Sequence, residues 1–149
     1  MDKTWILVAH RGGARLFENL GPDTGLTLVE AIPHPEGRLQ NQEINADRPG
    51  RSFDSMGHGR HSMGKEVEPT EQLAQRFAKK LSEKLDLARA EHRFSKLMLV
   101  AEPRFLGQLR DALPPHTAAL VSATLDKDLI GIEDRDLPGY LGKATHMQL

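Results

Sequence analysis

The chain has 149 residues, a formal net charge of −1, 28% charged residues and no cysteine. This length is typical of a single domain, which we expect over residues 1–149. The near-neutral charge excludes a general attraction to nucleic acid or anionic lipid, so any such affinity needs a local patch. The absence of cysteine excludes disulfides, thiolate metal sites and cysteine nucleophiles.

The apolar segments are too short for a membrane protein. None reaches the roughly 20 apolar residues that cross a bilayer. The run Trp5–Ala9 is also shorter than the apolar core of a signal peptide. We therefore expect a cytoplasmic protein with no membrane partner.

The first third of the chain is expected to form an antiparallel meander. The apolar run Trp5–Val8 has the composition of a buried strand. The adjacent glycines of Arg11-Gly12-Gly13 favour a tight turn, and Gly21-Pro22-Asp23 ends the next strand. The strands are expected at residues 5–8, 14–20 and 25–32. A turn at 33–37 and a short polar helix at 38–47 follow.

The second half predicts helices that alternate with strands. Thr70 is expected to cap a helix that ends near Glu91, with apolar residues at helical spacing: Leu73, Phe77, Leu81, Leu85 and Ala88. The apolar run Leu97–Ala101 predicts a strand covered on both faces, as in a parallel sheet. Pro103 opens a further helix. A strand at 117–125 and a helix at 136–143 complete an α/β domain with a mixed sheet.

The segment 48–65 is expected to be an exposed loop that attracts anions. It combines glycines with basic residues and precedes the long helix. Guanidinium groups bind phosphate in bidentate geometry, and glycines let backbone N–H groups approach it. A row of cations on the helix, ending at Lys84, would extend the patch. The expected anion or RNA contacts are Arg48, Arg51, Arg60, His61, Lys65, Arg76 and Lys80. The alternative is a solvated loop, whose arginines pair with Asp47, Asp54 or Glu66, beside a solvated helix face.

Several blocks resemble the bacterial host-attachment protein family. They are R-P-G-R-S-F-D at 48–54, G-R-H at 59–61, F-A-K-K-L at 77–81, L-M-L-V-A-E-P-R-F-L-G-Q-L-R at 97–110 and K-D-L at 127–129. The sequence departs from the family at Glu102, where a small residue or proline is more usual. The family name implies adhesion to host cells, which a cytoplasmic protein would affect indirectly.

The resemblance also implies a fold. The family is similar to the middle domain of archaeal and eukaryotic class-1 peptide release factors and of Pelota, which has an RNase H-like, three-layer α/β architecture. In release factors the corresponding loop carries a Gly-Gly-Gln tip that enters the ribosome. The loop here contains no glutamine, so that catalytic role does not transfer to any residue.

Three enzymatic chemistries are less well supported by the residues. His58, His61 and Asp54 could bind zinc but lack a rigid scaffold. Serines at 52, 55 and 62 lie near these histidines without a G-x-S-x-G elbow. An RNase H-like nuclease needs converging carboxylates, but Asp2 is terminal, and Glu18 and Glu30 have no evident partner. We therefore expect no catalytic residue, metal or cofactor.

Three other residues have simple structural interpretations. Glu102 follows a buried strand, where α/β proteins place ligand groups, but the favoured explanation is a carboxylate at a helix start, beside Pro103. Trp5 and Phe94 are expected in the core.

The favoured function is a non-enzymatic cytoplasmic protein that binds RNA or the ribosome through the 48–65 loop. Two alternatives remain open. One is a metal-dependent hydrolase or phosphoesterase that uses the same loop. The other is a protein-interaction module with Phe53 or Met56 as an apolar anchor. Exposed edge strands in the meander would also allow a homodimer.

Overall fold

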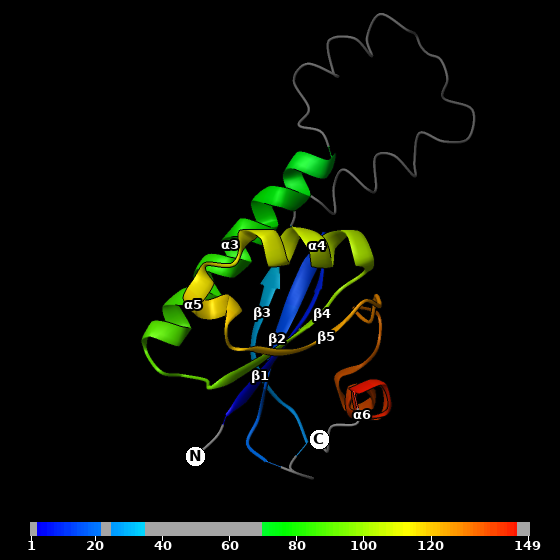
Figure 1. Cartoon of the computed structure of the whole chain (residues 1–149). Helices are drawn as coiled ribbons and strands as arrows, with labels where there is room; N and C mark the ends of the chain where they lie inside the picture. Colours follow the sequence, from blue (N-terminus) through cyan, green and yellow to red (C-terminus); the bar gives the residue numbers. More distant parts are fainter. Residues whose placement is uncertain (1–2, 22–24, 35–69, 146–149) are drawn as a thin grey trace, which may run out of the picture.

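The computed structural model describes residues 3–21, 25–34 and 70–145. Within these ranges the chain forms one mixed sheet with helices on both faces (Figure 1). The polar helix expected at 38–47 and the loop expected at 48–65 lie outside the described residues.

The sheet has the strand order β3-β2-β1-β4-β5. Strands β1 (Thr4–His10), β2 (Gly13–Asn19) and β3 (Thr27–Pro33) form the expected antiparallel meander. Strands β4 (Lys96–Val100) and β5 (Val121–Leu125) continue the sheet in parallel from β1. The α/β class and the mixed sheet are therefore confirmed, and β3 and β5 form the two edges.

The long helix α3 (Thr70–Ala90) and helix α4 (Pro103–Ala112) pack together on one face of the sheet. The expected apolar side of α3 is buried along its whole length, which confirms the periodicity. Its side chains form a core with alternate residues of the strands, including Leu7, Leu97 and Leu99.

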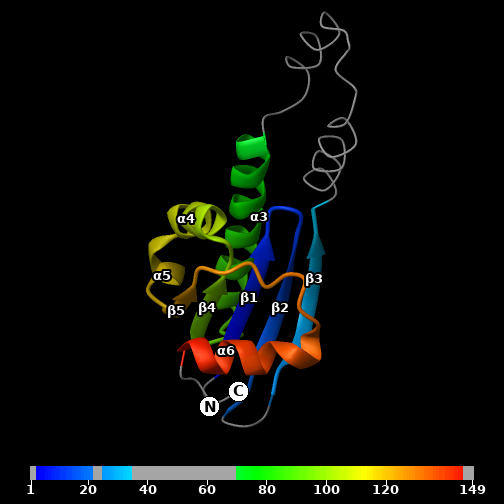
Figure 2. The same ribbon diagram turned by 90° about the vertical axis from the view of Figure 1, so that its right-hand side faces the viewer.

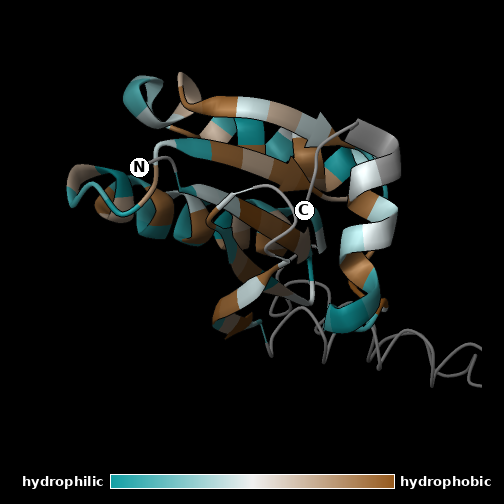
Figure 3. Cartoon of the chain, turned by 90° about the horizontal axis from the view of Figure 1, so that it is seen from below, coloured by the Kyte–Doolittle hydropathy of each residue, from teal (hydrophilic) through white to brown (hydrophobic). Residues whose placement is uncertain are grey.

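The opposite face of the sheet is covered by the C-terminal part of the chain. A 3-10 turn (Asp134–Asp136) leads into α6 (Leu137–Thr145), which crosses the strands (Figure 2). Leu137 and Leu141 of α6 pack there against the intervening strand residues, among them Ile6 and Met98. Apolar residues are concentrated along the central strands, between the two helical layers (Figure 3). The three-layer architecture is thus confirmed.

The connection between α4 and β5 differs from the expectation. A strand was expected over 117–125, but residues 115–118 form a helical turn, α5 (Pro115–Ala118), and β5 begins at Val121. Pro115 stands in the first turn, where proline favours a helix. Thr117 is fully buried and its hydroxyl contacts α3, which holds the turn against that helix. This contact, not local β propensity, decides the conformation.

The aromatic residues of the first core are placed as expected. Trp5 and Phe94 are both buried, with ring centroids 5.0 Å apart. The guanidinium of Arg93 lies over the Trp5 ring, 5.0 Å from its centroid. The prediction that Trp5 and Phe94 are core residues is confirmed.

Candidate functional site

The candidate site is the edge of the sheet at the carboxyl ends of β1, β3 and β4. Both described residues that flank the segment 35–69, His34 and Thr70, lie at this edge, directly after β3 and at the start of α3. In α/β proteins this edge is the usual position of ligand groups, because the loops that leave parallel strands meet there.

The row of cations on α3 has a fixed orientation. The ammonium group of Lys84 lies 2.8 Å from a carboxylate oxygen of Glu30 on β3, so this side of α3 is directed toward β3. Residues four apart share one side of a helix, which places Lys80 and Arg76 on the same side, successively nearer the start of α3. Both are exposed.

The cations of this row differ in whether a carboxylate is paired with them. Lys84 is paired with Glu30, so its charge is partly offset, whereas Lys80 is not in this pair. Within the part of the chain that the structure describes, no ion pair includes Lys80. The expected contact residues Arg76 and Lys80 are thus accessible to a partner from solvent. The other expected contacts, Arg48, Arg51, Arg60, His61 and Lys65, lie outside the described residues, as do the serines and histidines of the alternative sites.

Glu102 occupies the position between β4 and α4. One of its carboxylate oxygens accepts a hydrogen bond from the backbone N–H of Phe105 at 2.7 Å, and the other accepts one from Arg104 at 3.2 Å. Both donors would otherwise lack a helical partner. Glu102 is therefore the N-cap of α4, as its simpler interpretation predicted.

Two of the carboxylates considered for a nuclease, Glu18 and Glu30, have structural partners, and the third, Asp2, lies outside the described residues. Glu18 accepts a hydrogen bond from the indole N–H of Trp5 at 3.0 Å, and Glu30 pairs with Lys84. Neither contact brings a second carboxylate to these acids, and each holds its side chain in a contact between two elements of the fold. Across the described residues, no group of three potential ligands is placed to hold a metal ion.

Two histidines lie at the carboxyl edge of the sheet. The Nδ1 atom of His10 accepts a hydrogen bond from the backbone N–H of Gly12 at 2.9 Å. His34 is buried, with its ring stacked on Phe77 and its Nδ1 atom 2.5 Å from the carbonyl oxygen of Arg11. His34 thereby fixes the end of β3 against both α3 and the turn after β1.

Arg11 and Arg104 are cations that the sequence-based search did not single out. Together with Thr70, Glu71 and Gln108 they line a small pocket of about 70 Å³ between the starts of α3 and α4. The positions of these two arginines in the sequence, after predicted buried strands, could have indicated that they lie at this edge. Arg11 lies one residue beyond β1, and Arg104 lies four residues beyond β4, in the first turn of α4; the carboxyl ends of both strands reach this edge.

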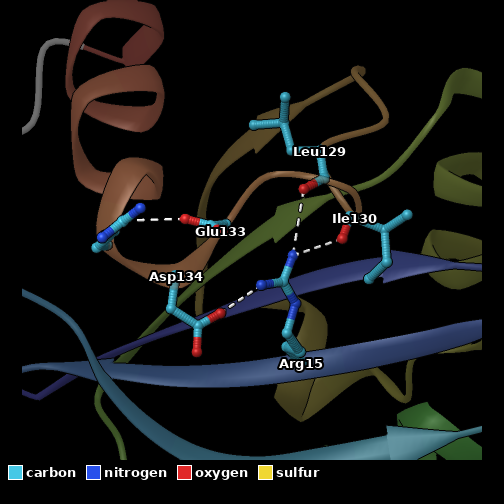
Figure 4. A network of polar contacts seen from close by, with 6 residues as sticks. Arg15, Leu129, Ile130, Glu133 and Asp134 are labelled. Carbon is cyan, nitrogen blue, oxygen red and sulfur yellow. Dashed lines mark hydrogen bonds and ion pairs between the residues drawn. The ribbon is translucent and has the colours of Figure 1, made fainter.

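Another arginine, Arg15, has a structural role that the sequence did not reveal. Arg15 of β2 donates hydrogen bonds to the carbonyl oxygens of Ile130 (2.7 Å) and Leu129 (3.3 Å), and it pairs with Asp134 (Figure 4). Its guanidinium also lies over the ring of Phe17. Arg15 therefore attaches the segment before α6 to the sheet.

The pKa of the Asp86 carboxyl group is shifted. The hydroxyl of Thr117 donates a hydrogen bond to Asp86 at 2.7 Å, and the guanidinium of Arg89 lies 3.1 Å from the same oxygen. The Thr117 hydroxyl, followed by Arg89, lowers the pKa of Asp86 below its ordinary value. This cluster joins α5 to α3.

The family model described as "Protein required for attachment to host cells" matches residues 5–141. The chain belongs to this family. The membership expected from the sequence blocks is confirmed. No curated protein sequence matches the chain significantly. Over the described residues, no helix has the length and apolar character needed to span a membrane.

Two solved structures are similar to this host-attachment family member. A structure titled "Archaeal protein" has a TM-score of 0.50 and 9% sequence identity, and the match covers 97% of this chain and 34% of that one. An archaeal translation termination factor has a TM-score of 0.47 and 10% identity, over 82% of this chain and 29% of the other. The chain thus spans about a third of the length of the structures it matches. At these identities the first likeness shows the fold alone.

Proposed function

We propose that this host-attachment family member is a cytoplasmic, non-enzymatic RNA-binding protein that contacts ribosomal or other RNA. Its contact surface comprises the basic segment 48–65, which lies outside the described residues, and the exposed cations Arg76 and Lys80 of α3. In this proposal the family's effect on attachment is indirect, through RNA or translation.

The observation that carries the proposal is the placement of Arg76 and Lys80. Both are exposed, they share one side of α3, and they lie in the turns that follow the basic segment. Phosphates of an RNA backbone are spaced along a line, so a row of cations one helical turn apart fits them without reading sequence.

The surroundings of these cations carry charges of both signs. Arg104 is exposed and Arg11 is half-exposed at the same edge, beside the start of α3. Glu71 and Glu102 line the same pocket, and the Glu102 carboxylate accepts hydrogen bonds from two backbone N–H groups. The support for RNA binding therefore comes from the exposed cations on α3 and not from the net charge of this edge.

An anisotropy titration with a labelled single-stranded RNA tests the proposal. Each phosphate contact contributes about −0.7 to the slope of log affinity against log salt for single strands. The double variant Arg76→Ala/Lys80→Ala should bind more weakly and reduce the magnitude of the slope by about 1.4. The sequence-derived variant Arg48→Ala/Arg51→Ala/Arg60→Ala should reduce it further.

A matched control removes the same charge elsewhere. Lys3 and Lys96 are exposed at the opposite, amino-terminal end of β1 and β4. The variant Lys3→Ala/Lys96→Ala should keep the affinity and the salt slope of the wild type. The proposal fails if wild type shows no salt-dependent binding, or if both double variants lose affinity equally.

A further inference from the structure

Strand β5 forms an edge of the sheet that carries little protection against pairing. Its sequence, Val121–Leu125, contains no charged residue and no proline. The opposite edge, β3, contains both Glu30 and Pro33. Edge strands expose unpaired backbone groups, and charges or prolines normally prevent another strand from adding to them. The β5 edge is therefore the better candidate for association.

A groove of about 690 Å³ runs between this edge and α4. It is lined on the helix by Gly107, Arg110 and Asp111 and on the strand by Ser122 and Thr124. Thr124 is exposed and pairs in register with Leu99, whose side chain packs on the α3–α4 side of the sheet. The groove thus has one wall from a helix and one from an unprotected strand.

Among the described residues, no contact explains the glycine at position 107. It lies inside α4, where glycine costs about 0.5–1 kcal/mol relative to alanine. A Cβ atom added at Gly107 would meet no atom within 4 Å, so neither crowding nor backbone conformation requires glycine there. The absence of a side chain at this point allows another polypeptide to approach the helix closely.

The charges in the groove suit a second copy of the same chain. Arg110 and Asp111 are adjacent in sequence, and neighbours in a helix do not face each other. No described ion pair includes either residue. Around a two-fold axis, Arg110 of one copy would face Asp111 of the other, so the patch is complementary to itself. Thr124 would lie opposite its own counterpart, a favourable cross-strand pair.

We propose that two copies of this chain associate through the β5 edge and the Gly107–Asp111 side of α4, across a two-fold axis. The register of β5 on β4 is regular from Ala123 to Leu125, and the strand contact is centred there. This dimer does not depend on RNA binding, and the two proposals can fail separately.

Sedimentation velocity from low to high micromolar concentration, without RNA, tests the dimer. Gly107→Leu places a branched side chain in the groove and should raise the dimer dissociation constant at least about tenfold. Gly139→Leu is the matched control, because Gly139 also lies in a helix, α6, where an added Cβ meets nothing within 4 Å. It should leave the dissociation constant unchanged.

A charge exchange distinguishes a lost contact from a misfolded chain. Arg110→Asp or Asp111→Arg alone should weaken the dimer by about tenfold, since each places like charges opposite one another. The double variant R110D/D111R restores opposite charges across the axis and should recover most of the affinity. A wild type that stays monomeric at every concentration would overturn the proposal. So would a dimer that Gly107→Leu and the single charge variants leave intact.

Discussion

Replacement of Arg15 by alanine should destabilise the protein more than any exposed charge substitution. The guanidinium joins β2 to the segment before α6, through the carbonyl oxygens of Leu129 and Ile130 and the carboxylate of Asp134. Its side chain is only 18% exposed. The variant removes the polar attachment of the layer that covers one face of the sheet.

The magnitude follows from the individual contacts. A hydrogen bond to a charged group contributes about 1.5–3 kcal/mol, and the 2.7 Å bond to Ile130 has the geometry for this range. The 3.3 Å bond to Leu129 is weaker. The Asp134 side chain is 49% exposed, so its ion pair adds at most about 1 kcal/mol. The freed carbonyl oxygens regain some water, and we expect a total loss of about 2–4 kcal/mol.

Urea unfolding followed by circular dichroism measures this loss, with Arg135→Ala as the control. Arg135 also makes an ion pair, with Glu133, but their side chains are 82% and 65% exposed. Its removal should change the free energy of unfolding by less than about 0.5 kcal/mol. A cost for Arg15→Ala no larger than that of Arg135→Ala would refute the reasoning.

Three further substitutions test local contacts. Glu102→Ala removes the N-cap of α4 and should lower the free energy of unfolding by about 1 kcal/mol in the same urea assay. Thr117→Val keeps the shape of a fully buried side chain but removes its hydroxyl, at an expected cost of about 1–3 kcal/mol; a neutral result would contradict its role in holding α5. Because the folded pKa of Asp86 is lowered, its stabilising contribution is complete above the ordinary value of 3.8 and is lost as the pH falls through the folded value. Asp86→Asn should therefore be less stable than wild type at neutral pH, and the difference should disappear in urea titrations carried out in acid.

The fold could be predicted from the sequence where local pattern and tertiary packing agree. The apolar positions of α3 recur at helical spacing, and all of those predicted are buried. The uninterrupted apolar run of β4 correctly indicated a strand covered on both faces. The prediction that the last strand begins at Thr117 was wrong, because a buried hydrogen bond from Thr117 to α3 overrides the local preference for a strand.

Side-chain partners were harder to predict than elements, because they depend on contacts between distant parts of the chain. The partners of Arg15 lie 114 to 119 residues away in sequence, and Lys84 lies 54 residues from Glu30. No spacing rule connects such residues before the topology is known. By contrast, Glu102 was interpreted correctly, since its donors lie two and three residues further along the same helix.

Co-sedimentation with ribosomes from lysate, at low and high salt, tests the proposed function most directly. The account predicts that wild type pellets with ribosomes at low salt and is released at high salt, because the contacts are to phosphate. Arg76→Ala/Lys80→Ala should remain largely in the supernatant, whereas Lys3→Ala/Lys96→Ala should pellet like the wild type. Wild type that stays in the supernatant at low salt would contradict ribosome binding. Pelleting that all variants share would contradict the assigned surface.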